Sequence, residues 1–261
     1  MRKSSVVLLV VLVMVLVAVG PRAKDVEHGH DMWTTDWSYD GVNGPAHWAD
    51  LDPEYAACKV GKEQSPVDIR TTTKAQLPEI RFEYKNGPLK IINNGHTAVR
   101  VNYARGNGNF LIVGARRYEL TQFHFHHPSE EYIEGKPYDM SIHLMHQADD
   151  GKTVAVAVLL KAGSANATID QLWQYMPGTA GEEHEIPGIE VAPARLLPRD
   201  MAHYTYMGSL TAPPCTEAVT WFVLKTPVDI SRAQINAFAK LYPHNVRPLQ
   251  PLNQRTVKES Q

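Results

Sequence analysis

The chain has 261 residues, of which 43% are hydrophobic and 21% are charged. These proportions are typical of a globular protein, and all-β proteins of this length commonly fold as one domain, so we expect one sizeable core. The formal net charge is -2 at pH 7 and the sequence has no long basic run, which argues against a nucleic-acid partner because such binding depends on clustered Lys and Arg.

The N-terminus differs in kind from the rest of the chain. Its opening MRKSS carries positive charge and is followed by an unbroken apolar run over residues 6–19. That run is short for a membrane span but fits the apolar region of a secretion signal. We therefore predict a signal peptide over residues 1–20, with residue 24 as its latest end, and export to the periplasm or the extracellular space. An uncleaved membrane anchor is the alternative.

The chain contains only two cysteines, Cys58 and Cys215. An oxidising compartment outside the cytoplasm favours a disulfide over two free thiols. A metal site that used both thiolates would need further Cys or His residues close to each of them in the sequence, and neither has such neighbours. We therefore expect a disulfide between these two residues.

Beyond the N-terminal region, Pro and Gly recur at short intervals, and the stretches between them are rich in Val, Ile, Thr, Phe and Tyr. This pattern is typical of strands joined by turns. Strands are predicted over residues 89–93, 97–103, 118–127, 140–147, 154–161 and 218–224. Helices should be few and short; the best candidate covers residues 231–241, where Ser231 and Gln234 have the spacing of a capping box. No repeat or linker divides the chain.

The stretch LTQFHFHHPSE, over residues 120–130, alternates histidine with phenylalanine on a predicted strand. Residues two apart on a strand project from the same face, so His124 and His126 point together while Phe123 and Phe125 point to the other side. Two imidazoles on one face can bind zinc, at about 2.0 Å from each nitrogen, if a third ligand comes from a neighbouring strand. Alternating His and Phe also suits an ordinary half-buried strand, so the pair alone does not establish a metal site.

His143, in the stretch SIHLMHQ, is the natural third ligand because it lies on the next predicted strand. His146 is three positions further along and therefore faces the opposite way, so we expect it in the core with a hydrogen bond. His127, His28 and His30 have no spacing that brings other ligands to them. We predict no metal-binding role for these three.

Several further stretches accompany the histidines: QSPVDI (64–69), NNGH (93–96), QFHFH (122–126), the pair SE (129–130), HLMH (143–146), GSLTAPPCTE (208–217) and RPLQPLNQR (247–255). In their order and approximate spacing they resemble the α-class carbonic anhydrases over about residues 37–257. The resemblance implies one domain over residues 37–261, preceded by an N-terminal segment over residues 21–36. It also implies a mainly β fold with short helices, built on a large twisted and mostly antiparallel central sheet.

The resemblance further implies a chemistry. The ligands of a Zn2+ ion would be His124, His126 and His143. A zinc-bound hydroxide would hydrate carbon dioxide reversibly to bicarbonate and a proton, with the pKa of the bound water lowered to about 7, a value already established for carbonic anhydrases. Thr211 matches the residue that accepts a hydrogen bond from this hydroxide, and Glu130 matches the carboxylate that accepts a hydrogen bond from the Thr211 hydroxyl. His96 matches the proton shuttle, a role that suits imidazole because it titrates near neutral pH.

Other positions match the surroundings of the family's site. The apolar wall for carbon dioxide would consist of Met145, Ala155, Leu210, Ala212 and Trp221. Residues around the ligands or the water chain would be Gln122, Ser141, Tyr39 and Asn94. Met145 and Ala155 stand where the family commonly has valines, one larger and one smaller, which suggests that their volumes compensate. For Tyr39 and Asn94 alone, a packed aromatic and a turn residue are the simpler interpretations.

The clearest departure from the family is Ser141, two residues before His143. The α class usually has a glutamate there that binds the distal N–H of the third ligand. Serine is shorter and uncharged, so we expect His143 to lack a charged partner and zinc to dissociate faster than is usual for the family. In the alternative, Glu131 or Asp139 has taken over this role.

Two other functions stay open on the sequence. A related module could bind zinc without catalysis, although Thr211, Glu130, His96 and the ligand histidines are all present. An unrelated β-barrel metalloenzyme could also use a His-x-His pair, but it would usually add a carboxylate ligand. For an active enzyme the expected partners are carbon dioxide and bicarbonate, with sulfonamides and small anions as inhibitors. A membrane partner is expected only if the N-terminal segment stays uncleaved.

Overall fold

The structure is a computed structural model and describes residues 37–96 and 99–261. The predicted signal peptide and N-terminal segment therefore lie outside the described residues, as do His28, His30 and the first two residues of the strand predicted over 97–103. Within the described part of the chain, no helix is both long enough and apolar enough to cross a membrane.

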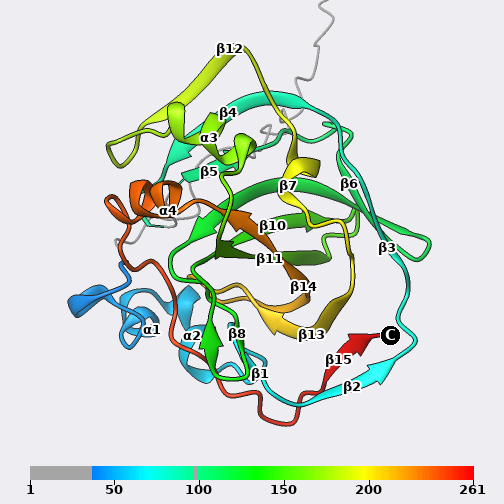
Figure 1. Cartoon of the computed structure of the whole chain (residues 1–261). Helices are drawn as coiled ribbons and strands as arrows, with labels where there is room; N and C mark the ends of the chain where they lie inside the picture. Colours follow the sequence, from blue (N-terminus) through cyan, green and yellow to red (C-terminus); the bar gives the residue numbers. More distant parts are fainter. Residues whose placement is uncertain (1–36, 97–98) are drawn as a thin grey trace, which may run out of the picture. The chain divides into compact units, whose positions relative to one another are not determined.

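Within the described residues, twelve strands form one large sheet, which is the frame of the domain (Figure 1). The strands in residues 37–96 and 99–261 are β1 (Asp68–Ile69), β2 (Thr72–Ala75), β3 (Ile80–Glu83), β4 (Gly87–Asn93), β5 (Val99–Asn102), β6 (Phe110–Val113), β7 (Arg116–His126), β8 (Tyr132–Ile133), β9 (Lys136–Pro137), β10 (Met140–Gln147), β11 (Thr153–Ala162), β12 (Glu183–Val191), β13 (His203–Ser209), β14 (Glu217–Ile230) and β15 (Val257–Ser260). The large sheet has the order β12-β4-β5-β7-β10-β11-β14-β13-β15-β2, with β6 paired to β7 and β3 to β6, and a small sheet has the order β1-β8-β9.

Most strand pairs of the large sheet are antiparallel, and the parallel ones are β11 with β14 and β15 with β2. The predicted mainly β fold, built on a large and mostly antiparallel sheet, is therefore confirmed.

The helices are short, as predicted. They are η1 (Gly41–Asn43), α1 (Trp48–Leu51), η2 (Pro53–Tyr55), α2 (Ala57–Val60), α3 (Ala167–Gln174), η3 (Pro193–Leu196) and α4 (Arg232–Ala239), where η denotes a 3-10 helix. At the start of α4 the Ser231 hydroxyl accepts a hydrogen bond from the Gln234 amide at 3.2 Å, and the Gln234 side chain accepts one from the Ser231 amide at 2.9 Å. The predicted capping box is therefore confirmed.

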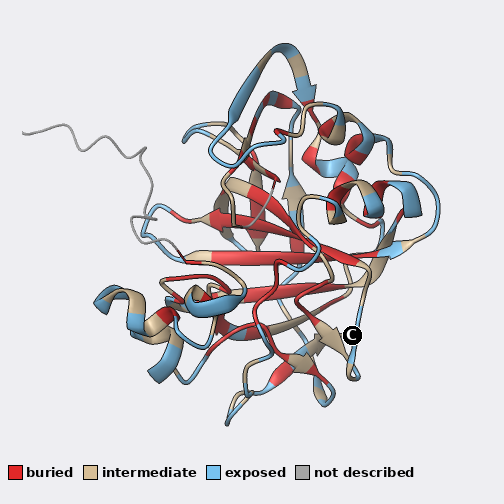
Figure 2. Cartoon of the chain, turned by 90° about the vertical axis from the view of Figure 1, so that its left-hand side faces the viewer, coloured by how far each residue is buried: buried red, intermediate tan, exposed pale blue. Residues whose placement is uncertain are grey.

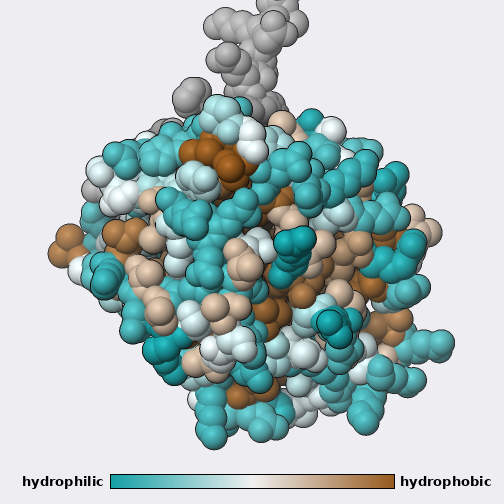
Figure 3. All heavy atoms as spheres, turned by 45° about the horizontal axis from the view of Figure 1, so that its top comes forward, coloured by the Kyte–Doolittle hydropathy of each residue, from teal (hydrophilic) through white to brown (hydrophobic). Residues whose placement is uncertain are grey.

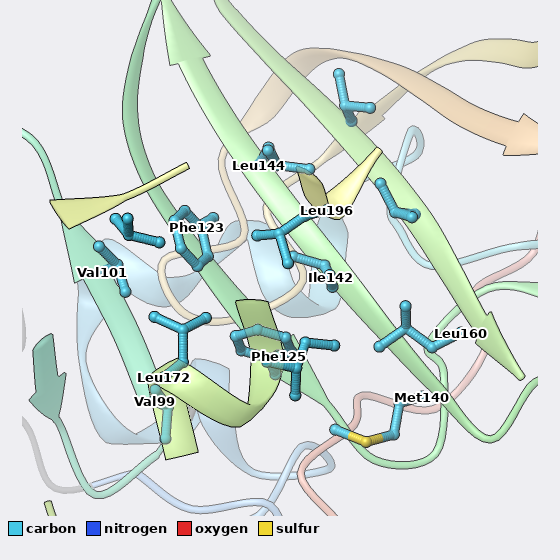
Figure 4. Close-up of a cluster of buried hydrophobic side chains, with 14 of the residues drawn as sticks. Val99, Val101, Phe123, Phe125, Met140, Ile142, Leu144, Leu160, Leu172 and Leu196 are labelled. Atoms are coloured by element: carbon cyan, nitrogen blue, oxygen red, sulfur yellow. The ribbon is translucent and has the colours of Figure 1, made fainter. Parts of the chain in front are cut away.

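The largest hydrophobic cluster lies against one face of the large sheet. Phe123 and Phe125 project from β7 onto this face and are fully buried. The Phe125 ring lies 4.8 Å from the ring of Trp173 on α3, and Phe238 of α4 belongs to the same cluster. Figure 4 shows part of this cluster, with Leu172 of α3 beside Phe125. Burial is concentrated in the central strands, whereas exposed residues lie mainly on helices, loops and outer strands (Figure 2).

The observed strands agree best with the predicted ones where the apolar pattern is strongest. β10 covers the predicted residues 140–147. β14 continues past the predicted end at residue 224 to Ile230, because its last residues pair with the end of β11, up to Ala162. The predicted elements include neither β12, which is largely exposed, nor β13, nor α3, whose start depends on one capping side chain, that of Asn166.

The predicted disulfide between Cys58 and Cys215 is present. It joins α2 to the loop between β13 and β14, across 157 positions of sequence. The disulfide thereby links α2 to the loop that contains Thr211.

The face drawn in Figure 3 is mainly hydrophilic, with small groups of hydrophobic residues between polar ones. In the described part of the chain, the exposed large hydrophobic side chains are those of Val42, Val60, Met207 and Leu249. Single exposed apolar side chains are normal on globular proteins.

Candidate metal centre

Three buried histidines meet on the side of the sheet opposite the phenylalanines. His124 and His126 lie on β7, and His143 lies on β10 directly across from His124 in the antiparallel pairing. The two strands are neighbours in the middle of the sheet (Figure 1). One side-chain nitrogen from each of the three rings lies within 4.8 Å of those of the other two. The structure thus brings together the three residues that the sequence predicts as ligands.

Each of these imidazoles is held by a hydrogen bond at one ring nitrogen. The contacts are His124 Nδ1 with Gln122 Oε1 at 2.8 Å, His126 Nδ1 with the Asn245 carbonyl oxygen at 2.7 Å, and His143 Nε2 with Glu131 Oε1 at 2.6 Å. All three partners are acceptors, so the bonded nitrogen carries the hydrogen and the other offers a lone pair. The buried Nε2 of His126 has no hydrogen-bond partner among the described residues, which fits a metal ion at this point.

Burial keeps two of the histidines neutral. It lowers the pKa of His124 and His126 well below the ordinary value for histidine, and the charges of neighbouring imidazoles lower both further. The neutral imidazole is the form that binds a metal ion. Burial alone would lower the pKa of His143, but the Glu131 and Glu130 carboxylates raise it, so a metal ion at this ring competes with a proton. The three imidazoles together form a donor set suited to zinc.

The expectation that His143 lacks a charged partner is wrong. Glu131 and His143 are both about 1% exposed, and the Glu131 carboxylate lies 2.6 Å from His143 Nε2. Burial alone would raise the pKa of Glu131, but the facing His143 ring and the Ser141 hydroxyl hold it below its ordinary value, so the carboxylate is charged. Asp139, the other candidate, instead accepts a hydrogen bond from the Arg232 side chain at 2.8 Å. Serine at position 141 therefore does not leave the ligand with a neutral partner.

Glu130 and Thr211, predicted as the catalytic pair, are both buried. One carboxylate oxygen of Glu130 lies 3.6 Å from His126 Nε2 and 3.9 Å from His143 Nδ1. The other accepts a hydrogen bond from the Arg247 amide at 2.7 Å. Burial raises the pKa of Glu130 to about 7, while the His143 ring and the Thr211 hydroxyl oppose the rise. One oxygen of this carboxylate is thus fixed by the backbone, and the other lies beside the three histidines.

Sequence reasoning assigned no role to Asn245 or Arg247. Asn245 reaches His126 through its backbone carbonyl, and no side-chain pattern identifies such a contact because every residue has this group. The Arg247 guanidinium is buried and donates hydrogen bonds to the Gln64 side chain and to two backbone carbonyls at 2.8–3.0 Å. The sequence shows no charged partner near Arg247. What could have pointed to this residue is its place in the stretch RPLQPLNQR.

Four predicted wall residues belong to one buried cluster near the histidines. Met145 on β10 is the register partner of Ala155 on β11, which is in turn the partner of Trp221 on β14. Leu210 packs against the same cluster. The Trp221 ring lies 4.8 Å from the His143 ring. Met145 and Ala155 are therefore direct neighbours, as compensation of their volumes requires.

The remaining predicted residues lie around these groups. His96 is half-buried and stacks on Trp37, with 4.4 Å between ring centroids. The Asn94 side chain accepts a hydrogen bond from the His96 amide at 3.1 Å, as in a turn. Tyr39 packs edge-on against Trp37, and its hydroxyl has no hydrogen-bond partner within the described residues. Ala212 is 9% exposed and lies outside the cluster that contains the other wall residues.

Comparison with known proteins identifies the family. Residues 43–261 match the family model described as eukaryotic-type carbonic anhydrase. The chain is 42% identical over 226 residues to a carbonic anhydrase of Neisseria gonorrhoeae (86% of this chain and 88% of the relative). It is 39% identical over 232 residues to one of Nostoc sp. (87% of each). The solved α-carbonic anhydrase of Thermovibrio ammonificans, in complex with the inhibitor sulfanilamide, matches with a TM-score of 0.82 and 40% identity over 86% of this chain and 99% of that one. The chain therefore belongs to the α-class carbonic anhydrases, enzymes whose general reaction is the hydration of carbon dioxide.

Proposed function

We propose that this chain catalyses the reversible hydration of carbon dioxide to bicarbonate and a proton at a zinc ion bound by His124, His126 and His143. The observation that carries the proposal is the set of three buried imidazoles, each fixed at one nitrogen, whose ligand nitrogens lie within 4.8 Å of one another. Imidazole ligands suit Zn2+ better than Mg2+ or Ca2+, which prefer oxygen. When bound, zinc supplies a Lewis acid that lowers the pKa of a coordinated water to about 7, as is established for carbonic anhydrases.

Glu130 and Thr211 orient the attacking hydroxide in this proposal. The Glu130 carboxylate accepts a hydrogen bond from the Arg247 amide and has a second oxygen for the Thr211 hydroxyl. The Thr211 hydroxyl has one hydrogen, and when it donates this in a hydrogen bond to Glu130, its oxygen can act only as an acceptor toward the nucleophile. With zinc bound, this arrangement would hold the proton of the nucleophile to one side and leave a lone pair free for the carbon of carbon dioxide.

His96 carries the released proton toward buffer. Imidazole in general titrates close to neutral pH, so it can take up and release protons without a large free-energy cost in either direction. Its half-buried position against Trp37 supports a role between the interior and solvent.

The apolar cluster with Met145, Ala155 and Trp221 provides the wall for the substrate. Carbon dioxide has no net charge and is a weak hydrogen-bond partner, so an apolar surface beside the hydroxide suits it. Sulfonamides and small anions are expected to inhibit by competing for the metal. The complex of the T. ammonificans enzyme with sulfanilamide supports this expectation.

Stopped-flow measurement of carbon dioxide hydration tests the proposal. Purified protein is assayed as zinc-loaded, after chelation, and after zinc is restored, with His126→Ala as the variant without a complete ligand set. We expect hydration to disappear on chelation and in the variant, and to return with zinc in the wild type. Zinc binding without hydration would indicate a noncatalytic module. Hydration that persists without metal would contradict the proposal, as would full activity in millimolar azide or a primary sulfonamide.

We also propose that the chain is exported, to the periplasm or the extracellular space. The Cys58–Cys215 disulfide supports this location, because disulfides persist in oxidising compartments. Cell fractionation combined with N-terminal sequencing of the mature protein tests both the export and the cleavage after residue 20. Recovery of the protein only from the cytoplasm, with free thiols, would contradict it.

A further inference from the structure

The carboxylate that contacts His143 comes from outside the ligand strands. His124 receives its partner from its own strand, because Gln122 lies two residues earlier on β7 and its side chain accepts the Nδ1 hydrogen at 2.8 Å. His143 lies on β10, but its partner Glu131 lies in the loop between β7 and β8, with 2.6 Å between Glu131 Oε1 and His143 Nε2. The two imidazoles are therefore held by different means.

The loop that carries Glu131 is tied down on both sides. The Ser129 hydroxyl donates a hydrogen bond to the Glu131 carbonyl oxygen at 2.8 Å and accepts one from the Tyr138 amide at 2.8 Å. The next residue, Tyr132, begins β8 and pairs with Asp68 of β1 in the small sheet. Glu131 thus projects from a backbone that is fixed by the small sheet and by a buried serine, which limits the freedom of its carboxylate.

Position 141 lies where a longer side chain would compete for the same N–H. Ser141 and His143 are two residues apart on β10 and so share one face of the strand, in the same relation as Gln122 and His124. Ser141 is fully buried, and its hydroxyl lies 3.5 Å from the Glu130 amide, which places it against the loop that carries Glu131. A side chain as short as serine leaves room for the carboxylate that arrives from that loop.

We propose that Glu131 is the residue that positions His143 for the metal, and that Ser141 is its obligatory small partner. The positioning carboxylate comes from the neighbouring loop and not from the strand that carries His143. Positions 131 and 141 are coupled, so the effect of a substitution at one of them depends on the residue at the other. This inference rests on the proposed function only in naming zinc as the ion.

Zinc release to a chelator tests the proposal on the intact, zinc-loaded protein. The variants are Glu131→Gln, Ser141→Glu and the double variant Glu131→Gln/Ser141→Glu. Glu134→Gln is the matched control, because Glu134 is an exposed carboxylate close to Glu131 in the chain. The melting temperature of each metal-free protein reports whether the fold is intact, and the visible spectrum of the cobalt-loaded protein reports the geometry of the ligands.

We expect Glu131→Gln to release zinc about 10 to 100 times faster than the wild type, with an altered cobalt spectrum. The double variant should release zinc at least about tenfold more slowly than Glu131→Gln. Its cobalt spectrum should be close to that of the wild type. Ser141→Glu alone should not slow release, because two carboxylates then compete for one N–H and repel each other. The control should match the wild type.

The proposal is overturned if Glu131→Gln releases zinc at the wild-type rate. It is also overturned if the double variant releases zinc as fast as Glu131→Gln. If the glutamine variant does not fold, Glu131→Asp serves in its place. It keeps the charge on a shorter side chain, so it should release zinc faster than the wild type by a smaller factor, and an unchanged rate overturns the proposal. The measurement is zinc release and does not depend on catalysis. If the variants release zinc at the expected rates but the wild type does not hydrate carbon dioxide, the proposed function fails and this inference stands.

Discussion

The Nδ1 atom of His126 lies 2.7 Å from the backbone carbonyl oxygen of Asn245, 119 positions further along the chain. The Asn245 side chain fixes this contact. Its Oδ1 accepts a hydrogen bond from the His127 amide at 2.8 Å, and its Nδ2 donates one to the Phe125 carbonyl at 3.0 Å. The loop before Arg247 is thus fastened to the end of β7 on both sides of a ligand histidine.

We therefore expect Asn245→Ala to weaken both the fold and the metal centre. The change leaves the buried Phe125 carbonyl without its partner, which costs about 1–3 kcal/mol, and also removes the partner of the partly buried His127 amide. It also frees the carbonyl that orients His126, so zinc release should accelerate. Urea unfolding of the metal-free protein and release to a chelator measure the two effects. Asn236→Ala, on the exposed face of α4, should change stability by no more than about 0.5 kcal/mol; equal behaviour of the two variants would contradict this account.

The ligand histidines could be predicted from sequence because local rules suffice for them. The two-residue period of a strand places His124 and His126 on one face, and antiparallel pairing of the next strand brings His143 opposite. The cysteines could be paired because the chain offers only two. In each case the prediction does not depend on the path of a loop.

The partners of the ligands could not be predicted in the same way. Three residues near His143 in sequence, at positions 131, 139 and 141, could each have supplied an acceptor for its N–H. The backbone path between β7 and β10 decides among them, and it turns Glu131 inward while Asp139 pairs with Arg232. A sequence pattern specifies such a path poorly because it depends on contacts such as those of Ser129 with Tyr138 and with the Glu131 carbonyl.

The second prediction concerns the disulfide. Closing a loop of 157 positions stabilises the folded state by about 4 to 5 kcal/mol on the chain-entropy model. Cys215 also lies four residues after Thr211, in the same loop. We expect a reductant to lower the melting temperature before it lowers hydration activity at room temperature, because the unfolded state gains freedom while the folded site persists. Mass spectrometry that finds two free thiols in the exported protein would rule this out.

The third prediction tests the shuttle. His96→Ala should lower turnover in weak buffer on the order of tenfold or more, because the released proton then lacks a carrier. Added imidazole should restore the rate, and isotope exchange between carbon dioxide and bicarbonate at equilibrium should change little, since it needs no net proton export. His184→Ala, an exposed histidine, is the control. Equal losses in turnover and in exchange would remove His96 from this role.

The fourth prediction concerns the wall residues Met145 and Ala155, which face each other across β10 and β11. Ala155→Val alone should destabilise by about 1–3 kcal/mol because it overpacks the site, and Met145→Val alone should destabilise by about 1 kcal/mol or more because it leaves a void. The double variant should be more stable than the sum of the two losses implies. Met140→Val combined with Ala155→Val is the control, because Met140 belongs to the other buried cluster, and its effect should be additive. Additive losses in the facing pair as well would show that the two volumes do not compensate.

The last prediction concerns acid stability and His146, which is fully buried as the sequence predicts, with its Nε2 2.5 Å from the Tyr84 hydroxyl. Burial lowers the pKa of His146 from 6.5 to about 3 in the folded protein. Below pH 6.5 His146 therefore binds a proton in the unfolded chain but not in the folded chain. Its contribution to the free energy of unfolding is complete above pH 6.5 and is lost progressively as the pH falls toward 3. Between pH 7 and pH 4 the loss amounts to about 3 kcal/mol. Urea unfolding across this range should show that His146→Gln loses less stability with acid than the wild type. Tyr84→Phe keeps the buried imidazole, so it should be less stable throughout but should retain the wild-type slope. Parallel curves for the wild type and His146→Gln would show that this histidine does not set the acid response.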